Sequence, residues 1–359
     1  MYKSAAAVQV APVKAAPKRA APRAAPARTE LQDAPPIECI ADLVKIGRGV
    51  TFYKNLDILS LWKITPHLEQ LDEMVGLQSL KESIFLQVLY YLQGLHRKPK
   101  RRRQSESAAS SAPADEENTD YLHTMIYGSP GTGKTTIAKI IGSIYVGLGV
   151  LSKTGVFKVA YRDDFISGYA GQSALKTRAL LESCIGGTLF VDEIYSLAAT
   201  NPEHDQFSQE AINILTAFLS EHKNDFCLIG AGYEDSVKQN LFSLNKGLKR
   251  RFPWVHRIET YTPVEMAQIF FKLLADSGWD HRLDVEWLAR LIETNRDLFP
   301  CFGGDIETFL SKCRVFHSKR VFTLSAKDKY ILIDKDVMTA LEYLKGMAPS
   351  DTGHLIMYG

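Results

Sequence analysis

The sequence predicts an α/β protein in which a doubly wound parallel sheet is followed by a small lid of four helices. Strand-like apolar runs alternate with helical patterns between residues 121 and 261, which is typical of a parallel sheet with crossover helices. A glycine-rich phosphate-binding motif joins the first strand-like run to the first helical pattern. After Tyr261 the strand-like runs stop, and only helical patterns follow.

The individual elements are expected in a regular order along these two regions. Apolar runs predict strands at residues 121–128, 157–165, 187–194, 226–233 and 255–261. Helical spacing of apolar residues between them predicts helices that include 133–147, 172–185 and 207–222. Four further helical patterns predict the lid, near residues 263–277, 284–297, 304–320 and 335–346.

The rest of the chain is expected to alternate between disordered and folded segments. The N-terminal tail is rich in alanine, proline and basic residues, and its prolines forbid a continuous helix. A targeting segment is the alternative for this tail. A second low-complexity stretch opens with the basic run 97–103 and ends in acidic residues. Six segments are therefore predicted: a disordered basic tail (1–34), an N-terminal helical part of the folded module (35–96), a disordered charged insertion (97–120), a P-loop α/β core (121–261), a helical lid (262–348) and a C-terminal tail (349–359).

Composition and charge exclude several classes of protein. The 359 residues are 45% apolar and 23% charged, which is typical of globular domains. The formal net charge is only +2, so the chain as a whole is not a strongly basic nucleic-acid binder. No run of apolar residues is long enough to predict a membrane-spanning helix, and no membrane partner is expected. The five cysteines include no CxxC pair, which favours free thiols in a reducing intracellular compartment. We expect the cytoplasm, with the nucleus or a plastid as alternatives.

Residues 128–135 match the P-loop pattern GxxxxGK[ST], which is a signature of phosphate binding. In such a loop, backbone N–H groups close around the phosphates of a nucleotide, and the following helix adds the positive end of its dipole. Lys134 is expected to reach the β- and γ-phosphates, and Thr135 to ligate Mg²⁺. The predicted ATP-binding residues of this loop are Gly128, Ser129, Pro130, Gly131, Thr132, Gly133, Lys134, Thr135 and Thr136.

Two acidic residues follow an apolar run at the end of an expected strand. Asp192 is expected to hold Mg²⁺, directly or through water, and Glu193 to polarise the attacking water. Carboxylates at the end of a buried strand are costly unless they meet a cation, which favours a metal-nucleotide site over a simple acidic cap. The pair therefore predicts an ATPase that uses Mg²⁺ with ATP.

Three classes of P-loop protein compete for this pattern. A GTPase needs a guanine-reading NKxD motif, and the nearest stretch, residues 245–248, lacks the aspartate. A small-molecule kinase does not need a water-activating glutamate directly after the Mg²⁺-binding aspartate. The helical lid after the core favours the third class, an oligomeric motor ATPase.

The chain resembles AAA+ ATPases, and specifically the branch that contains red-type rubisco activase and the sporulation stage V protein K. The similarity runs from about Met74 to Leu344. Four blocks carry it, in the order that the branch has them: residues 169–177, 186–193, 231–235 and 245–252.

The resemblance implies roles for several further residues. Val75 and Gly76 are similar to a segment that contacts adenine, and Tyr169 to an aromatic pore loop that grips a polypeptide. Arg251, with Arg250 as second choice, is similar to an arginine finger that reaches the ATP of a neighbouring subunit. The resemblance therefore implies a ring of identical subunits, with a hexamer expected, that remodels a protein partner.

Two positions depart from the pattern common among AAA proteins. Many of them carry an asparagine that senses the γ-phosphate at the end of the fourth strand. This chain has Ala231-Gly232-Tyr233 there, as the resembling branch does, which makes Tyr233 a candidate sensor. Gly304 stands where the lid usually offers a second sensor, an arginine. The missing arginine puts the coupling between lid and nucleotide in question, but it leaves the hydrolytic residues in place.

Three functions remain open at this point. The first is an ATP-hydrolysing motor that remodels an unidentified protein through a ring pore. The second is a nucleic-acid-handling ATPase that uses the basic tail and the run 97–103. The third is a nucleotide-gated scaffold with little turnover, which the missing second sensor favours. Rubisco as a substrate is not implied.

Overall fold

The computed structural model describes residues 33–49, 51–97, 121–167, 172–198, 206–322 and 329–347. Almost all of the predicted tail and of the charged insertion, including the basic run after Arg97, lie outside the described residues. So does Tyr169, the residue predicted to form the pore loop.

Five parallel strands form the central sheet, in the order β2-β3-β4-β1-β5. The P-loop follows β1, which lies between β4 and β5, and the acidic pair follows β3. All parallel strands end at the same edge, so these two segments are brought together there. The predicted parallel sheet is confirmed, with strands β1 Thr124–Tyr127, β2 Phe157–Ala160, β3 Thr188–Val191, β4 Cys227–Gly232 and β5 Trp254–Arg257.

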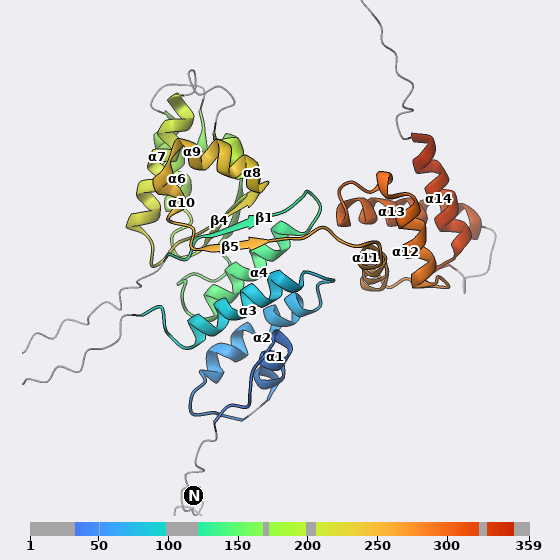
Figure 1. The fold of residues 1–359 in the computed structure, drawn as a ribbon, viewed down its shortest axis with the longest axis horizontal. Coiled ribbons are helices and arrows are strands. Elements are labelled where there is room, and N and C mark those ends of the chain that lie inside the picture. Colours follow the sequence, from blue (N-terminus) through green and yellow to red (C-terminus); the bar gives the residue numbers. More distant parts are fainter. Residues whose placement is uncertain are drawn as a thin grey trace, which may run out of the picture.

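Helices cover both faces of this sheet (Figure 1). Neighbouring residues of one strand belong to the two different hydrophobic clusters, one on each side of the sheet. On β1, Ile126 packs with helices α1 to α4, whereas Met125 and Tyr127 pack with α6 and α7. A sheet buried on both faces explains why its strands are almost continuously apolar. The first layer contains α1 Ile40–Arg48, α2 Ile58–Asp72, α3 Gln78–Leu92 and α4 Lys134–Gly147, and the second contains α6 Gln172–Glu182 and α7 Gln206–Glu221.

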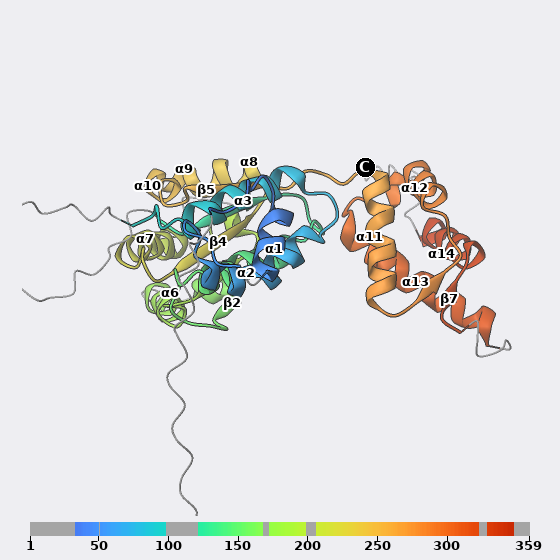
Figure 2. The ribbon, with the colours of Figure 1, turned by 90° about the horizontal axis from the view of Figure 1, so that it is seen from below.

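The lid is a group of helices beside the core, joined to it by the chain that follows β5 (Figures 1 and 2). Its first helix starts at a capping box, in which the Thr262 backbone donates to Glu265 at 2.8 Å and the Glu265 backbone donates to the Thr262 hydroxyl at 3.3 Å. The predicted four-helix lid is confirmed, with α11 Pro263–Asp276, α12 Val285–Thr294, α13 Gly303–Val321 and α14 Asp334–Met347.

Three details of the sequence prediction were wrong. The strand predicted at residues 157–165 ends at Ala160, because Asp164 accepts a hydrogen bond from the Tyr161 backbone at 2.9 Å and starts the short helix α5, Arg162–Phe165. The segment after β4 forms four short helical elements that were not predicted: α8 Glu234–Ser236, a π-helix at Val237–Leu241, α9 Phe242–Leu244 and α10 Lys246–Lys249. The lid also contains a parallel pair of two-residue strands, β6 Asp280–His281 and β7 Ile331–Leu332, which are too short to give a periodic signal.

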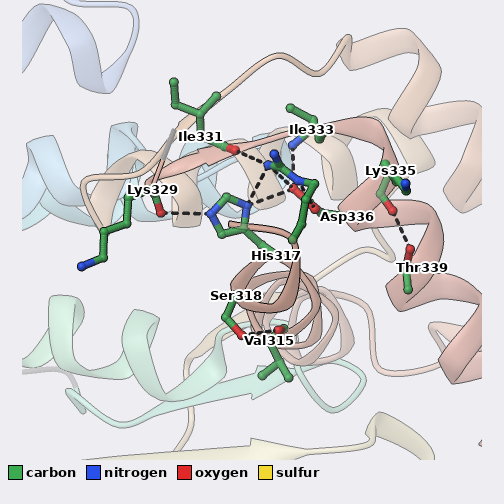
Figure 3. Close-up of polar contacts among 10 residues, drawn as sticks. Val315, His317, Ser318, Lys329, Ile331, Ile333, Lys335, Asp336 and Thr339 are labelled. Atoms are coloured by element: carbon green, nitrogen blue, oxygen red, sulfur yellow. Dashed lines mark hydrogen bonds and ion pairs between the residues drawn. The ribbon is translucent and has the colours of Figure 1, made fainter. Parts of the chain in front are cut away.

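A buried polar cluster ties α13, α14 and β7 together within the lid (Figure 3). The Asp336 carboxylate lies 3.0 Å from Nδ1 of His317 and accepts hydrogen bonds from Arg320 at 2.8 and 2.9 Å. His317 and Asp336 are almost fully buried. Burial opposes ionisation of this carboxyl, but hydrogen bonds from Arg320 and His317 hold its pKa below the usual range. The cluster is thus a compensated buried ion pair.

Two further findings concern the chain as a whole. None of the described helices is both long and apolar enough to cross a membrane. All five cysteines are free thiols, and three of them are buried.

Candidate nucleotide-binding site

The P-loop leaves β1 and enters α4 through two left-handed glycines. Gly131 has φ +70° and Gly133 has φ +87°, values that residues with a side chain rarely adopt. The Thr132 hydroxyl donates to the Ser129 carbonyl at 2.8 Å, which closes the turn between them. The loop therefore has the backbone conformation that lets consecutive N–H groups face an anion.

The ammonium group of Lys134 lies over this loop. It donates to the carbonyl oxygens of Gly128 at 3.1 Å and Ser129 at 3.0 Å, and the residue is only 7% exposed. These bonds hold the positive charge at the mouth of the loop, at the start of α4. A cation and a helix N-terminus thus face the same space, which is the electrostatic arrangement that binds phosphates.

The acidic pair follows β3, at the same edge of the sheet. Asp192 accepts a hydrogen bond from the Glu193 backbone at 3.0 Å. Glu193 itself has φ +48°, a strained value for a residue with a long side chain, and its Oε2 atom is buried without a hydrogen-bond partner. Backbone strain and an unpaired buried oxygen are characteristic of catalytic positions.

A cavity of about 360 Å³ brings the loop and the acidic pair together. Of the residues predicted to bind ATP or Mg²⁺ or to act in hydrolysis, eight line this cavity: Pro130, Gly131, Gly133, Lys134, Thr135, Thr136, Asp192 and Glu193. The lid contributes the remaining lining residues, Gly303, Gly304 and Glu307. The cavity therefore lies between the core and the lid.

The lid touches the P-loop backbone directly. A Cβ atom on Gly131 would lie 2.0 Å from the carbonyl oxygen of Cys301, and one on Gly303 would lie 2.9 Å from the Gly131 carbonyl. Gly304 has no left-handed φ, and a Cβ there would lie 3.4 Å from Cα of Gly131. Tyr261 adds a hydrogen bond from its hydroxyl to the Thr132 carbonyl at 3.2 Å.

The predicted adenine segment borders this site but does not line the cavity. A Cβ atom on Gly133 would lie 3.4 Å from the end of the Met74 side chain, which places this segment beside the loop. Gly76 has φ +64°, and a Cβ there would lie 2.3 Å from Glu265 at the start of the lid. Val75 and Gly76 thus lie where the core meets α11.

The two candidate arginine fingers lie elsewhere, after α10. Arg251 donates to the Ser220 hydroxyl at 2.8 Å and to the Gly247 carbonyl at 2.6 Å, whereas Arg250 is exposed. Neither residue lines the cavity of its own subunit.

The candidate sensor Tyr233 follows β4 and leads to a residue that the sequence did not single out. Its ring centroid lies 6.3 Å from that of Tyr195, and a Cβ atom on Gly232 would lie 2.9 Å from the Tyr195 ring. Burial and the Glu193 carboxylate raise the pKa of the Tyr195 hydroxyl. Tyr195 therefore connects Glu193 with Tyr233. An aromatic residue shortly after a buried strand usually belongs to the hydrophobic core, so no pattern in the sequence indicates this role for Tyr195.

The residues present fit a magnesium nucleotide. Two left-handed glycines and a buried lysine form the anion cradle. Thr135 and Asp192 line the same cavity and offer the hard oxygen ligands that Mg²⁺ prefers. Glu193, whose buried Oε2 atom is unpaired, lines this cavity too.

Together, this sheet order, the loop after β1 and the acids after β3 define the class of P-loop nucleoside triphosphatases. The family model for the ATPase family associated with various cellular activities (AAA) matches residues 124–253. The chain is also 33% identical to protein CbbX of Cereibacter sphaeroides over 264 residues, which are 72% of this chain and 80% of that protein. The chain belongs to the AAA family of ATPases, and CbbX is consistent with the branch predicted from the sequence.

Two further proteins are similar over comparable lengths. The putative cfxQ-like protein R730 of Acanthamoeba polyphaga mimivirus is 33% identical over 271 residues, 75% of this chain. The match spans 61% of that protein, so this chain covers less than two thirds of its length. The crystal structure of the FIGL-1 AAA domain in complex with ADP has a TM-score of 0.53 at 18% identity, over 76% of this chain and 83% of that one. At that identity the likeness concerns the fold alone.

Proposed function

We propose that this AAA ATPase binds Mg²⁺-ATP in the cavity between core and lid, hydrolyses it, and uses the reaction in a ring of subunits to remodel a protein partner. One observation carries the hydrolytic step: the strained Glu193, with an unpaired buried oxygen, lines the same cavity as Lys134 and Asp192. The relatives support the family, and the FIGL-1 domain was crystallised with ADP.

The chain's own groups divide the work of hydrolysis among them. The P-loop N–H groups and Lys134 bind the β- and γ-phosphates and offset charge on them. Thr135 and Asp192 would hold Mg²⁺, which supplies further neutralisation of phosphate charge when it is bound. Glu193 orients a water molecule for attack on the γ-phosphorus and accepts its proton.

A neighbouring subunit completes the site. Lys134 is the only cation among the lining residues of the described cavity, and the lid side carries Gly304 and Glu307. Arg251 of the next subunit would supply a second positive charge, which stabilises the negative charge of the transferred phosphoryl group. Tyr169, which lies outside the described residues, would engage the partner polypeptide in the ring.

A Glu193→Gln variant tests the hydrolytic step. The amide keeps the shape of the side chain but cannot take the proton, so turnover should fall by about 10²-fold or more while ATP binding is retained. Steady-state phosphate release and fluorescent-nucleotide binding measure the two effects. Glu182→Gln is the matched control, because Glu182 is exposed and pairs with Arg178 on the surface of α6. Turnover at the wild-type rate would remove Glu193 from the mechanism.

The same hydrolysis-blocked variant tests the remodelling step. A ring that binds ATP without hydrolysing it should retain the partner protein, which a pull-down from the source cell followed by mass spectrometry would identify. Tyr169→Ala should then leave basal ATPase largely intact and abolish remodelling of that partner. Full remodelling by this variant would contradict threading through the pore.

The lid side of the cavity favours a second candidate function. It presents two glycines and a glutamate where a cation would sense the γ-phosphate. A nucleotide-gated scaffold with slow turnover would have this composition. A steady-state rate per subunit that stays near the uncatalysed level, in an ATP-assembled oligomer, would favour the scaffold over the motor.

A further inference from the structure

A second cavity lies at the opposite edge of the sheet from the P-loop. Its volume is about 400 Å³, and the strand residues that line it, Phe157 and Thr188, are the first residues of β2 and β3. The rest of the lining comes from α2, from the C-terminal half of α4 and from the loop before β2: Lys63, His67, Gly142, Ser143, Val146, Gly147, Thr154, Gly155 and Val156. α2 and α4 pack side by side in the first helix layer (Figure 1). α4 starts at the P-loop and spans about 20 Å to reach this cavity.

Thr188 lines this cavity and carries a buried hydroxyl that has no partner among the described residues. The residue is 1% exposed, and its backbone N–H donates to the Val156 carbonyl at 2.9 Å. A Cβ atom on Gly142 would lie 2.8 Å from Oγ1, so the absence of a side chain at Gly142 lets α4 pass this close to the hydroxyl. A buried hydroxyl without a partner destabilises the fold, and valine would fill the same volume without that cost.

Lys63 gives the lining of this cavity a positive charge. Lys63 and His67 are four residues apart on α2, so they project from the same face of the helix. No aspartate or glutamate is among the lining residues of this cavity. Ser143 adds a second hydroxyl, while Val146 and Phe157 supply apolar surface. A cationic rim, an apolar wall and a polar floor suit a small organic anion.

We propose that this cavity binds a small organic anion, with a carboxylate or phosphate group on an apolar body. The anionic group pairs with Lys63 and His67, the body packs on Val146 and Phe157, and a polar atom of the ligand pairs with the Thr188 hydroxyl. The site is separate from the nucleotide pocket and does not depend on the proposed ATPase mechanism.

Phenyl phosphate and benzoate are the probes, because each joins an anion to an apolar ring, and benzyl alcohol is the uncharged control. The full chain is first saturated with Mg²⁺-ADP, so that the P-loop cannot take the phosphate. Saturation-transfer NMR and titration calorimetry then measure binding. We expect saturable binding of at least one anion in the millimolar range or tighter, and at least tenfold weaker binding of benzyl alcohol. A preference between the two anions tells a phosphate site from a carboxylate site.

Variants locate the binding. Thr188→Val should weaken it about fivefold, and Thr188→Ser, which keeps the hydroxyl, should retain most of it. Lys63→Ala should weaken it about three- to tenfold. Lys139→Ala is the matched control, because Lys139 is exposed on α4 and does not line the cavity. No saturable binding of either anion, or binding that Thr188→Val and Lys63→Ala leave unchanged, would overturn the proposal.

A stability measurement tests the hydroxyl independently of any ligand. If Thr188 is unpaired in the free protein, Thr188→Val should raise the melting temperature by about 2–4 °C, since it removes a buried polar group at constant volume. A lower melting temperature would show that the hydroxyl has a structural partner, which would remove it from the site. ATP hydrolysis is measured on the same variants as a separate readout. Loss of anion binding with unchanged hydrolysis concerns this cavity, whereas absence of hydrolysis in the wild type concerns the proposed ATPase function.

Discussion

The two sides of the nucleotide cavity come from different parts of the chain and carry different groups. The core side offers a lysine, two threonines, two carboxylates and the glycine loop. The lid side offers Gly303, Gly304 and Glu307, and its backbone touches the loop at Gly131. In the proposed function the core holds the groups for binding and cleavage, whereas the lid's part of the cavity lining contributes close backbone packing and no positive side chain. Chemistry and coupling to the lid are therefore separable by mutation.

The largest effect is expected at Arg251, the proposed arginine finger, which a neighbouring subunit would add to the cavity. Arg251→Ala should lower turnover by about 10³-fold or more, as for other arginine fingers, because the transferred phosphoryl group loses the arginine that stabilises its negative charge. ATP binding by the same subunit should change little. Mixed with Glu193→Gln subunits, Arg251→Ala subunits should regain part of the activity. A concentration-independent ATPase rate in a wild-type monomer would contradict a shared site.

The choice between the two arginines has its own control. Arg251 is hydrogen-bonded to Ser220 and Gly247, whereas Arg250 is exposed. Arg250→Ala should therefore have a much smaller effect if Arg251 is the finger. The reverse order of effects would reassign the role to Arg250.

A second large effect is expected within the lid, on stability rather than chemistry. Asp336→Asn removes the charge that pairs with Arg320 and His317, and should destabilise the lid by about 3–5 kcal/mol, as for other broken buried ion pairs. Hydrogen exchange should show faster opening of α13 and α14, with α4 in the core unchanged. Equal loss of protection in both parts would show that the lid does not unfold separately.

The pH dependence of the same cluster follows from the lowered pKa of Asp336. A carboxyl whose pKa is lower in the folded state stabilises the fold above its unfolded pKa of about 4, and that contribution is lost as the pH falls through the folded value. Unfolding of the wild-type lid should therefore become easier in acid. The Asn variant should lack this part of the acid dependence.

The core side of the cavity could be predicted from the sequence more fully than the lid side. The P-loop is a local motif, and its two left-handed glycines follow from the residues themselves. Asp192 and Glu193 were predictable because they end an apolar strand. The contact of Gly131 with Cys301 joins residues far apart in the chain, so no local pattern reveals it. The two-residue strands β6 and β7 carry too little periodicity to be detected.

A moderate effect is expected from adding a positive side chain to the lid side of the cavity, where the lining residues include none. Gly304 has a helical backbone, and a Cβ there fits at 3.4 Å from Gly131, so arginine can be accommodated at the start of α13. Gly304→Arg should bind ATP severalfold more tightly than the wild type, with a smaller gain for ADP, because the added charge faces the γ-phosphate. Glu307 lines the same cavity and would compete for the arginine, so the gain should rise in Gly304→Arg/Glu307→Gln. Unchanged affinity in both folded variants would show that the lid does not sense the nucleotide through this position.

The smallest effect is expected at Tyr195, which links Glu193 on the core side to the candidate sensor Tyr233. Tyr195→Phe keeps the ring against Gly232 and near Tyr233 but removes the hydroxyl beside the Glu193 carboxylate. We expect that hydroxyl to orient the carboxylate, and Tyr195 does not line the nucleotide cavity, so kcat should fall about two- to fivefold while KM for ATP and ADP affinity stay unchanged. A purely structural role would instead lower the melting temperature and leave kcat intact. Tyr233→Phe is the companion variant. If the two hydroxyls act together, kcat of the double variant should fall no further than in the more damaging single variant. If the two losses of kcat multiply, Tyr233 acts on the nucleotide by itself.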